Sequence, residues 1–224
     1  MCGRYTLTAT DLGEVVSLLD AILEPAAAAL HRPRYNIAPT DTVVLARPGS
    51  PSAGEPDRPR LVPAVWGLRR AERLILNVRS EGAATRFREA YQRRRCVVPA
   101  DGFYEWTGPA RDRRPTWFHA ADGALLLMAG LFDGGSEAAP PTFAVLTTAS
   151  RPPVAAIHDR MPVLLSPEGA RRWFLGEQPA LLDEVSLSSR PVSARVNGTV
   201  HDDPACLAPP GEAGGRAGAQ LRLF

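Results

Sequence analysis

The sequence predicts a single α+β domain that is rich in mostly antiparallel strands. Its length of 224 residues is typical of one domain. The chain is 45% hydrophobic and 22% charged, which provides enough apolar material for a buried core. Most apolar runs are short and are separated by loops rich in proline and glycine, a pattern that favours strands over long helices.

Helical segments are expected in two places. Residues 12–30 carry apolar side chains at helical spacing as far as Pro25, which breaks or restarts the helix. Residues 167–175 predict a further helix, with Ser166 as its N-cap and Pro167 in its first turn. Both segments are expected to flank the sheet.

Short apolar runs between these helices predict the strands. A surface insertion is expected over 47–60 and another loop over 133–141, because both are rich in proline, glycine or serine. The domain is expected to cover 1–207, and the proline- and glycine-rich residues 208–224 to form a disordered tail. The expected strands are 42–46, 61–66, 73–79, 102–106, 124–131 and 142–148.

Composition excludes several classes of protein. No apolar stretch approaches the roughly 20 residues that span a bilayer, and acidic residues interrupt the apolar residues near the start of the chain. We therefore expect no membrane segment and no secretory signal. The net charge of +2 does not by itself indicate a nucleic-acid partner. Every basic residue is arginine, so no lysine amine is available as a nucleophile.

The cysteines and histidines predict no metal site and no cofactor. Cys2, Cys96 and Cys206 are widely spaced and odd in number, which suggests a reducing, intracellular environment. No histidine joins a cysteine at zinc-type spacing. Three of the histidines are interpreted as structural or solvated: His31, His119 and His201.

Cys2 is a candidate nucleophile. A small second residue normally permits removal of Met1, which would leave an α-amine and a thiol on the same residue. Because the ordinary pKa of an α-amine is about 7.7–8.0, part of it is unprotonated at neutral pH. With an aldehyde, amine and thiol could act in turn to form an imine and then a thiazolidine. With an acyl substrate, the thiol would attack and the amine would serve as base.

Several further motifs follow Cys2 in order along the chain. Together they closely resemble the SRAP family, the SOS-response-associated peptidase-like proteins that crosslink to abasic sites in single-stranded DNA. The resemblance extends from Cys2 to about residue 200. The motifs are Met1-Cys2-Gly3-Arg4-Tyr5, Arg34-Tyr35-Asn36-Ile37-Ala38-Pro39-Thr40, Trp66-Gly67-Leu68, Asn77-Val78-Arg79-Ser80-Glu81, Arg94-Arg95-Cys96, Ala100-Asp101-Gly102-Phe103-Tyr104-Glu105-Trp106 and Ile157-His158-Asp159-Arg160-Met161-Pro162.

The resemblance implies a compact, mainly antiparallel, barrel-like α+β fold with a positively charged groove for single-stranded DNA. It implies that Cys2, Asn77, Glu105 and His158 form the catalytic site. It also implies a monomer that acts in the cytoplasm and associates with the nucleoid when bound to DNA. The DNA-binding residues expected from it are Arg4, Asn36, Pro39, Trp66, Arg79, Arg86, Phe87 and Arg160.

Strand alternation supports part of this site. In a strand over 102–106, Phe103 and Glu105 point to one face and Tyr104 and Trp106 to the other. A carboxylate among apolar neighbours has a raised pKa, which suits proton transfer near neutrality. The same alternation over 73–81 would place three polar residues on one face of a strand. These are Asn77, Arg79 and Glu81.

The expected activity is a thiazolidine crosslink between Cys2 and the ring-opened aldehyde of an abasic site. His158 would transfer protons at the sugar ring oxygen, Glu105 would act on the Cys2 amine, and Asn77 would hold the adduct. Weak abasic-site lyase activity and self-processing at Met1 are also expected. The arginine runs Arg93-Arg94-Arg95 and Arg111/Arg113/Arg114 are interpreted as solvated faces, and a position near the DNA stays open for the first run.

Two other functions remain open from the sequence. The first is an N-terminal-nucleophile glutaminase, in which the Cys2 thiol attacks the glutamine amide and Asn197-Gly198 resembles an oxyanion-hole pair. Against it, Arg4-Tyr5 in this sequence does not match the residues that follow the cysteine in that family. Glu105 and His158 would also have no role. The second is a non-covalent single-strand-binding module in which Cys2 is inert.

Overall fold

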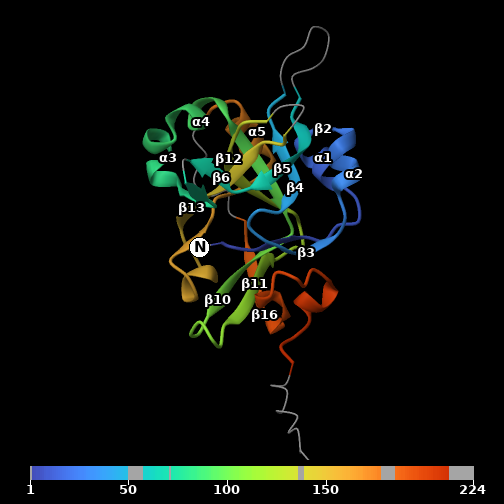
Figure 1. The fold of residues 1–224 in the computed structure, drawn as a ribbon, viewed down its shortest axis with the longest axis vertical. Helices are drawn as coiled ribbons and strands as arrows, with labels where there is room; N and C mark the ends of the chain where they lie inside the picture. The colour runs from blue at the N-terminus through green and yellow to red at the C-terminus, as the bar shows by residue number, and fades with distance from the viewer. Residues whose placement is uncertain (1, 50–57, 71, 136–138, 178–184, 212–224) are drawn as a thin grey trace, which may run out of the picture.

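In the residues that the structure describes, the protein folds as an α+β unit in which two larger β-sheets pack together beside a two-stranded ribbon, and helices cover the outside (Figure 1). A computed structural model describes residues 2–49, 58–70, 72–135, 139–177 and 185–211. The central part of the expected 47–60 insertion and most of the expected 208–224 tail lie outside these residues. Within the described residues, no helix has the length and apolar character needed to cross a membrane.

The expected helices are present at both places. Helix α1, Gly13–Leu19, ends at Asp20, whose φ of 48° is left-handed, and α2, Pro25–Leu30, begins at the proline that was expected to restart the helix. The short strand β2, Ile22–Leu23, lies between them. Helix α5 covers Pro167–Phe174, and the Ser166 hydroxyl caps it by accepting a hydrogen bond of 2.9 Å from the Gly169 N–H.

The segment expected as one strand over 73–79 is divided between two sheets. Strand β7, Arg73–Ile75, pairs with β6, Leu68–Arg70, in a two-stranded ribbon. Strand β8, Asn77–Arg79, instead runs parallel to β13, Thr142–Ala149. Helix α3, Ser80–Arg86, starts directly after β8, so the prediction that Glu81 shares a strand face with Asn77 is wrong.

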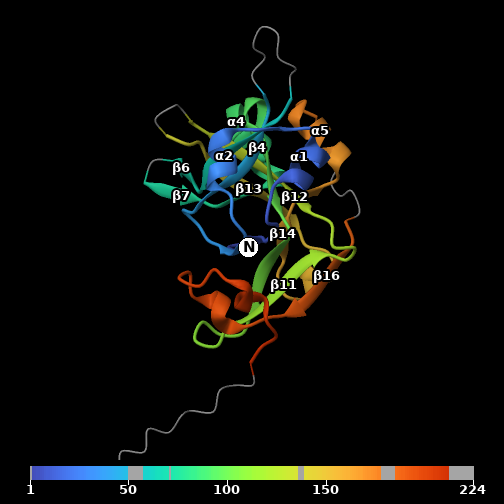
Figure 2. The same ribbon diagram turned by 90° about the vertical axis from the view of Figure 1, so that its right-hand side faces the viewer.

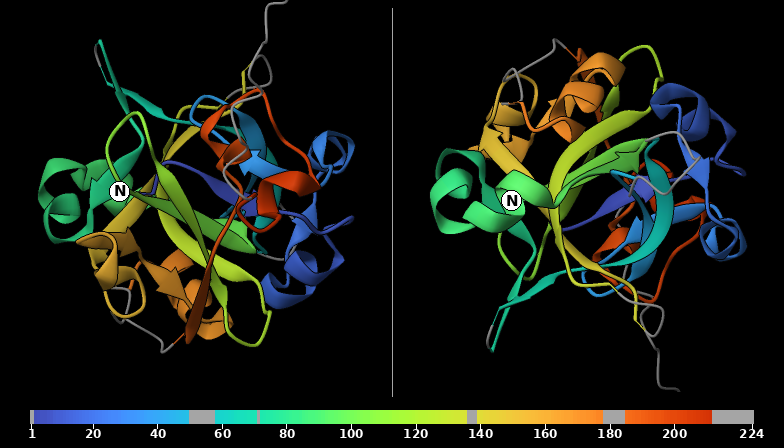
Figure 3. Two further views of the ribbon diagram at one scale, coloured as in Figure 1. Left: turned by 90° about the horizontal axis from the view of Figure 1, so that it is seen from below. Right: turned by 90° about the horizontal axis from the view of Figure 1, so that it is seen from above.

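Among the described residues, the larger sheet has nine strands and a barrel-like curvature. Its main path runs β14-β13-β12-β9-β4-β5-β2, and β13 also pairs with β5, which brings distant parts of the path together (Figure 3). Most pairs are antiparallel, as the sequence predicts; β13–β5, β13–β8 and β2–β5 are parallel. The remaining strand bounds in this sheet are β4 Thr42–Arg47, β5 Arg60–Trp66, β9 Arg95–Ala100, β12 Leu126–Asp133, β14 Arg160–Pro162 and β15 Leu164–Leu165.

The smaller sheet carries the N-terminal strand. Its strand order is β16-β11-β10-β1-β3, and all its pairs are antiparallel. Three short 3-10 helices follow or flank the strands; two of them lie in the C-terminal segment beside this sheet (Figure 2). The bounds are β1 Tyr5–Leu7, β3 Arg34–Ile37, β10 Gly102–Thr107, β11 Arg114–Ala120, β16 Leu187–Pro191, η1 Val154–Ala156, η2 Ala194–Asn197 and η3 Pro204–Leu207.

Strand β10 separates two apolar clusters, and the expected alternation explains this. Phe103 points into the main core, where its ring stacks on Phe118 with centroids 5.3 Å apart. Tyr104 points the other way, into a smaller cluster with Val192 and Val196. Both faces of β10 are therefore covered by protein. For this reason the side chain of Glu105, which lies on the same face as Phe103, is buried.

Arg95 follows helix α4, Arg88–Arg93, at the start of β9, and it differs from the expected solvated arginine run. Arg95 is only 5% exposed, and its guanidinium lies over the rings of Tyr91 and Trp173, 4.5 and 4.1 Å from their centroids. The interpretation of this residue as part of a solvated face is wrong. It joins α4 and α5 to the sheet by donating to main-chain carbonyls of both helix ends.

Candidate active-site cleft

The pairing of β1 with β10 places the start of the chain beside Glu105. Tyr5 lies opposite Phe103 and Thr6 opposite Gly102. The Tyr104 N–H continues the pairing by donating to the Arg4 carbonyl at 3.0 Å. Because antiparallel partners keep a constant sum of residue numbers, this register carries the residues before Arg4 alongside Glu105.

A cleft of about 630 Å³ opens where these segments meet. Glu105 reaches it from β10, and His158 reaches it from the loop after η1. Arg4 and Pro39, both expected to bind DNA, also line it. The complete lining is Gly3, Arg4, Ala38, Pro39, Glu105, Trp106, Gly108, Arg113, His158, Asn197 and Thr199.

Glu105 has the protonation behaviour expected of a proton-transfer group. It is 3% exposed, and this burial raises the pKa of its carboxyl group, because the charged form loses its hydration. Nearby positive charge lowers the pKa in part, that of the His158 imidazole included. A carboxyl group with a raised pKa can accept and return a proton close to neutral pH.

His158 is held by its own loop. Its side chain is 27% exposed, and its Nδ1 accepts a hydrogen bond of 2.9 Å from the Arg160 N–H. In the neutral ring this contact leaves the proton on Nε2. The same Nδ1 lies 3.0 Å from Asp159 Oδ1. When the ring is protonated, this oxygen can accept a hydrogen bond from the Nδ1–H. Both protonation states of His158 therefore have a partner in the loop.

Asn77 connects the larger sheet to the N-terminal segment. Its Nδ2 donates to the Cys2 carbonyl oxygen at 2.9 Å. Its Oδ1 is buried and has no hydrogen-bond partner among the described residues. A buried amide oxygen without a partner is costly in a folded protein, so this acceptor marks the position as one suited to a further donor.

Cys2 lies against this group of residues with its thiol fully buried. The Sγ is 3.6 Å from the Arg4 carbonyl, to which it donates. Burial raises the pKa of the thiol far above its ordinary value, and the negative charge of Glu105 raises it further. The thiol is therefore neutral at physiological pH, and the structure brings all four expected catalytic residues together: Cys2, Asn77, Glu105 and His158.

Asn36 and Trp66 do not contact the solvent, so the prediction that they bind DNA is not supported. Asn36 is 1% exposed, accepts a hydrogen bond of 2.7 Å from Arg4 Nη1, and donates to carbonyls of the segment 196–201. Trp66 is fully buried; its indole contacts Tyr5 edge-on and donates from Nε1 to the Leu76 carbonyl. Asn36 thus supports Arg4 of the cleft lining, whereas Trp66 belongs to the main core.

Arg160 is also part of the framework. It is 7% exposed, and its guanidinium makes two hydrogen bonds to the Glu81 carboxylate, at 2.6 and 2.9 Å, and one to the Thr147 carbonyl at 2.6 Å. The guanidinium is thus almost entirely buried and already paired with a carboxylate. The sequence pattern of charged residues beside His158 could not distinguish this buried pair from a DNA contact.

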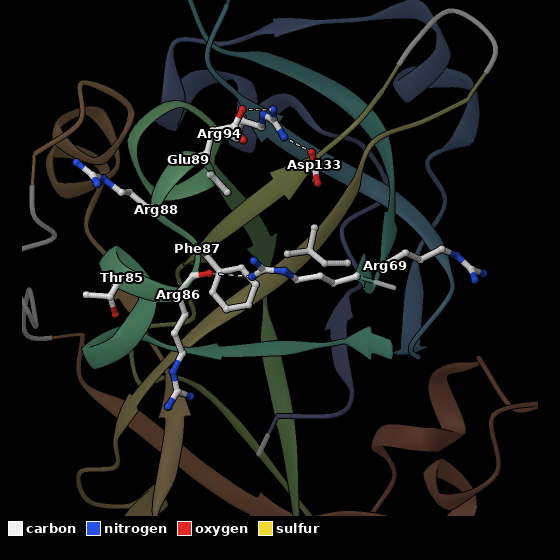
Figure 4. A pocket seen from close by; sticks show the side chains of 11 residues that line it. Arg69, Thr85, Arg86, Phe87, Arg88, Glu89, Arg94 and Asp133 are labelled. Carbon is white, nitrogen blue, oxygen red and sulfur yellow. Dashed lines mark hydrogen bonds and ion pairs between the residues drawn. The ribbon is translucent and has the colours of Figure 1, made fainter. Parts of the chain in front are cut away.

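The remaining expected DNA contacts lie away from the cleft lining. Arg79 is exposed at the end of β8. Arg86 and Phe87 line a separate hollow of about 340 Å³ between α3, α4 and β6 (Figure 4). In it the Arg70 guanidinium lies 5.2 Å from the centre of the Phe87 ring and donates to the Arg86 carbonyl.

The sequence did not indicate four polar or aromatic residues of the cleft lining. Two of them could have been found from their place in the sequence. Trp106 directly follows Glu105 on β10, and Arg113 lies in the hairpin loop after the same strand. Only the glutaminase alternative tied Asn197 to this site from the sequence, and the C-terminal fold is what brings the segment 197–199 to the cleft. The missed residues are Trp106, Arg113, Asn197 and Thr199.

Most of this chain matches a known protein family. The family model for SOS response associated peptidase (SRAP) matches residues 1–199. The chain belongs to the SRAP family. The abasic site processing protein YedK of Escherichia coli is 32% identical over 188 residues, which cover 79% of this chain and 81% of YedK. YoqW of Bacillus subtilis, also named an abasic site processing protein, is 29% identical and is covered to 80%.

Solved structures show the same SRAP fold. A phage-related protein from Bordetella bronchiseptica superposes with a TM-score of 0.67 and 28% identity, covering 87% of this chain and 95% of that protein. A protein from Bacteroides thetaiotaomicron reaches a TM-score of 0.71 at 18% identity, over 93% of this chain and 99% of that one. The second likeness concerns the fold alone.

Replacing Glu105 by glutamine should stabilise the protein at neutral pH. The folded pKa of Glu105 lies above its unfolded value, so stability is lost as the pH rises from the unfolded pKa toward the folded pKa, and the cost is complete above the folded pKa. The variant E105Q should therefore melt at a higher temperature than the wild type at pH 7.5, and this gain should disappear below about pH 4, where both states of Glu105 are protonated. Calorimetry at both pH values measures it.

The exposed Glu72 provides the matched control, since E72Q removes the same charge without relieving any burial. A loss of stability in E105Q that is equal at both pH values would contradict the assignment of a costly buried charge at this position.

Acid should weaken the Glu81–Arg160 pair over a defined range. The Arg160 guanidinium lowers the pKa of Glu81 to about 2. The stability that this ion pair contributes is thus complete above the ordinary carboxyl pKa of about 4.3 and is lost as the pH falls toward 2. Urea unfolding should show that E81Q is less stable than the wild type at pH 6, with a difference that shrinks by pH 2.5. A difference that stays constant would exclude the ion pair as its source.

Proposed function

We propose that this protein binds single-stranded DNA and forms a covalent crosslink between Cys2 and the open aldehyde of an abasic site. One observation carries the proposal: the segment of Cys2 is paired alongside a buried carboxyl group with a raised pKa, in the cleft that also contains His158. The relatives named as abasic site processing proteins support this choice of substrate. Arginines in the cleft lining suit a phosphate backbone.

The reaction starts with the sugar in its closed hemiacetal form. His158 gives its proton to the ring oxygen as the bond between C1′ and that oxygen breaks, and the C1′ hydroxyl passes its own proton back to the imidazole as the aldehyde forms. Proton number is unchanged overall, so this step is an isomerisation. His158 suits it because each of its protonation states has a partner in the loop.

The Cys2 amine attacks before the thiol does. Loss of Met1 would create this amine, and Glu105 takes a proton from the ammonium to make it nucleophilic. The thiol does not compete at this stage, because burial and Glu105 both keep it protonated. Attack on C1′ forms a C–N bond and gives a carbinolamine.

Ring closure completes the crosslink. The protonated Glu105 gives its proton to the carbinolamine hydroxyl, which leaves as water, and the carboxylate then takes the N–H proton of the resulting iminium ion to give the imine. The thiol then adds across the C=N bond, so that sulfur bonds to C1′ and the thiol proton moves to nitrogen. The product is a thiazolidine equal to protein plus DNA minus one water. Asn77 holds the Cys2 carbonyl, and its buried Oδ1 can accept from the ring nitrogen.

Two side reactions follow from the same groups. If the imine persists, removal of a C2′ proton expels the 3′ phosphate by β-elimination, which is a weak lyase activity. Self-processing at Met1 requires water to attack the peptide bond before Cys2, and Glu105 is the base beside this segment. The name of the family, which refers to a peptidase, is consistent with that step.

The glutaminase alternative lacks its oxyanion site. Asn197 donates from Nδ2 to the Arg113 carbonyl at 3.0 Å and accepts from Trp106 Nε1 at 2.7 Å. Its amide is thus engaged by the protein on both sides. A glutaminase would also leave the buried carboxyl group of Glu105 without a function.

Crosslinking to an abasic single-stranded oligonucleotide tests the proposal. The wild type should gain the mass of the oligonucleotide minus one water, whereas C2A should gain nothing. The variant E105Q should react about 10²- to 10⁴-fold more slowly, the usual contribution of a positioned acid–base group. Intact-mass spectrometry and a denaturing gel measure both quantities.

Cys206 supplies the matched control, because it is also a buried free cysteine but lies in the smaller cluster. C206A should crosslink at the wild-type rate. Full crosslinking by a folded C2A would refute the role of Cys2, and binding without any adduct in the wild type would favour the non-covalent module.

A further inference from the structure

The loop between β10 and β11 forms one wall of the cleft. Arg113 is its last residue before β11, and it lines the cleft with Glu105 and His158. Gly108 opens the loop with a φ of +85°, and a Cβ at this position would meet the Asp112 carbonyl oxygen at 2.5 Å. Only glycine fits there.

Asn197 fixes this wall from the opposite side. Its Oδ1 accepts from Trp106 Nε1 at 2.7 Å, and its Nδ2 donates to the Arg113 carbonyl at 3.0 Å. One amide thus bridges the end of β10 and the end of the loop. The main chain of Arg113 is therefore held from both the hairpin and the C-terminal segment.

The guanidinium of Arg113 is available to a ligand. Its side chain is exposed, and it takes part in no ion pair within the described part of the chain. The one acidic residue of its loop, Asp112, lies 3.5 Å from Arg114. Arg4, by contrast, uses Nη1 to hold Asn36 and the Val196 carbonyl.

We propose that Arg113 binds a backbone phosphate of the single strand in the cleft, and that Asn197 is the residue that positions it. This inference rests on the proposed function for the identity of the ligand, and it replaces the interpretation of Arg113 as part of a solvated face. A guanidinium on a fixed loop suits the task, because its planar N–H groups match two phosphate oxygens. The contact carries no sequence information, as a lesion-binding protein requires.

Salt dependence of binding to an undamaged single-stranded oligonucleotide tests the proposal. Each phosphate contact on a single strand contributes about 0.7 to the slope of log K against log salt. R113A should lower that slope by about 0.7 and weaken binding about two- to fivefold at 0.1 M salt. R111A, which removes an equal charge from the same loop but not from the cleft lining, should change the slope little. Equal losses in both variants would refute a specific contact.

The positioning role of Asn197 has its own readout. N197A should lose the same part of the slope as R113A, and the double variant should lose no more than either one. Additive losses would show that Asn197 acts only through general stability. Melting temperatures of all variants exclude unfolding as the cause.

The two proposals can fail separately. Undamaged DNA needs no chemistry at Cys2, so a lowered slope in R113A supports this contact even if the wild type forms no crosslink. A wild type that crosslinks abasic DNA while R113A and R111A bind alike would refute the contact alone. A wild type that binds no single-stranded DNA would refute both.

Discussion

The antiparallel pairing of β1 with β10 is the constraint on which the rest of the site depends. It fixes the register in which Tyr5 faces Phe103, and so carries Cys2 past Glu105. A shift of one residue would turn Glu105 toward the wrong face of the strand and expose Phe103. The site therefore inherits its precision from main-chain hydrogen bonds, and the Asn77 amide reinforces that placement from the larger sheet.

Burial gives this site its reactivity and also its cost. Glu105 is useful because its surroundings make the charged form unfavourable, and the same surroundings reduce the stability of the folded state at neutral pH. Burial of the Cys2 thiol sets an order for the proposed chemistry, since a neutral thiol adds to an imine but is a poor first nucleophile. Burial therefore raises the pKa of both groups, which makes Glu105 a proton acceptor near neutral pH and keeps the Cys2 thiol protonated.

A second polar network holds the C-terminal wall of the cleft. Burial acts to raise the pKa of Asp202, but hydrogen bonds from the Tyr35 N–H and the Arg34 guanidinium outweigh it and lower that pKa. The Asp202 carboxylate also accepts from the Asn36 N–H at 2.9 Å. Asn36 in turn holds the carbonyls of 196–201, so a motif expected to bind DNA instead binds the segment that carries Asn197.

The sequence alone determined the local features: the helix restart at Pro25, the Ser166 cap, the hairpin strands and the two-faced alternation of β10. These depend on neighbours in the chain, which the sequence displays. It also supplied Glu105 and His158, which line the cleft, and Cys2 and Asn77, which lie behind it in contact with each other, through motifs in order. Only the tertiary structure decided which charged and aromatic side chains remain accessible. Trp66, Asn36 and Arg160 are buried by partners at least ten residues away in the chain, and a residue's burial depends on what packs over it.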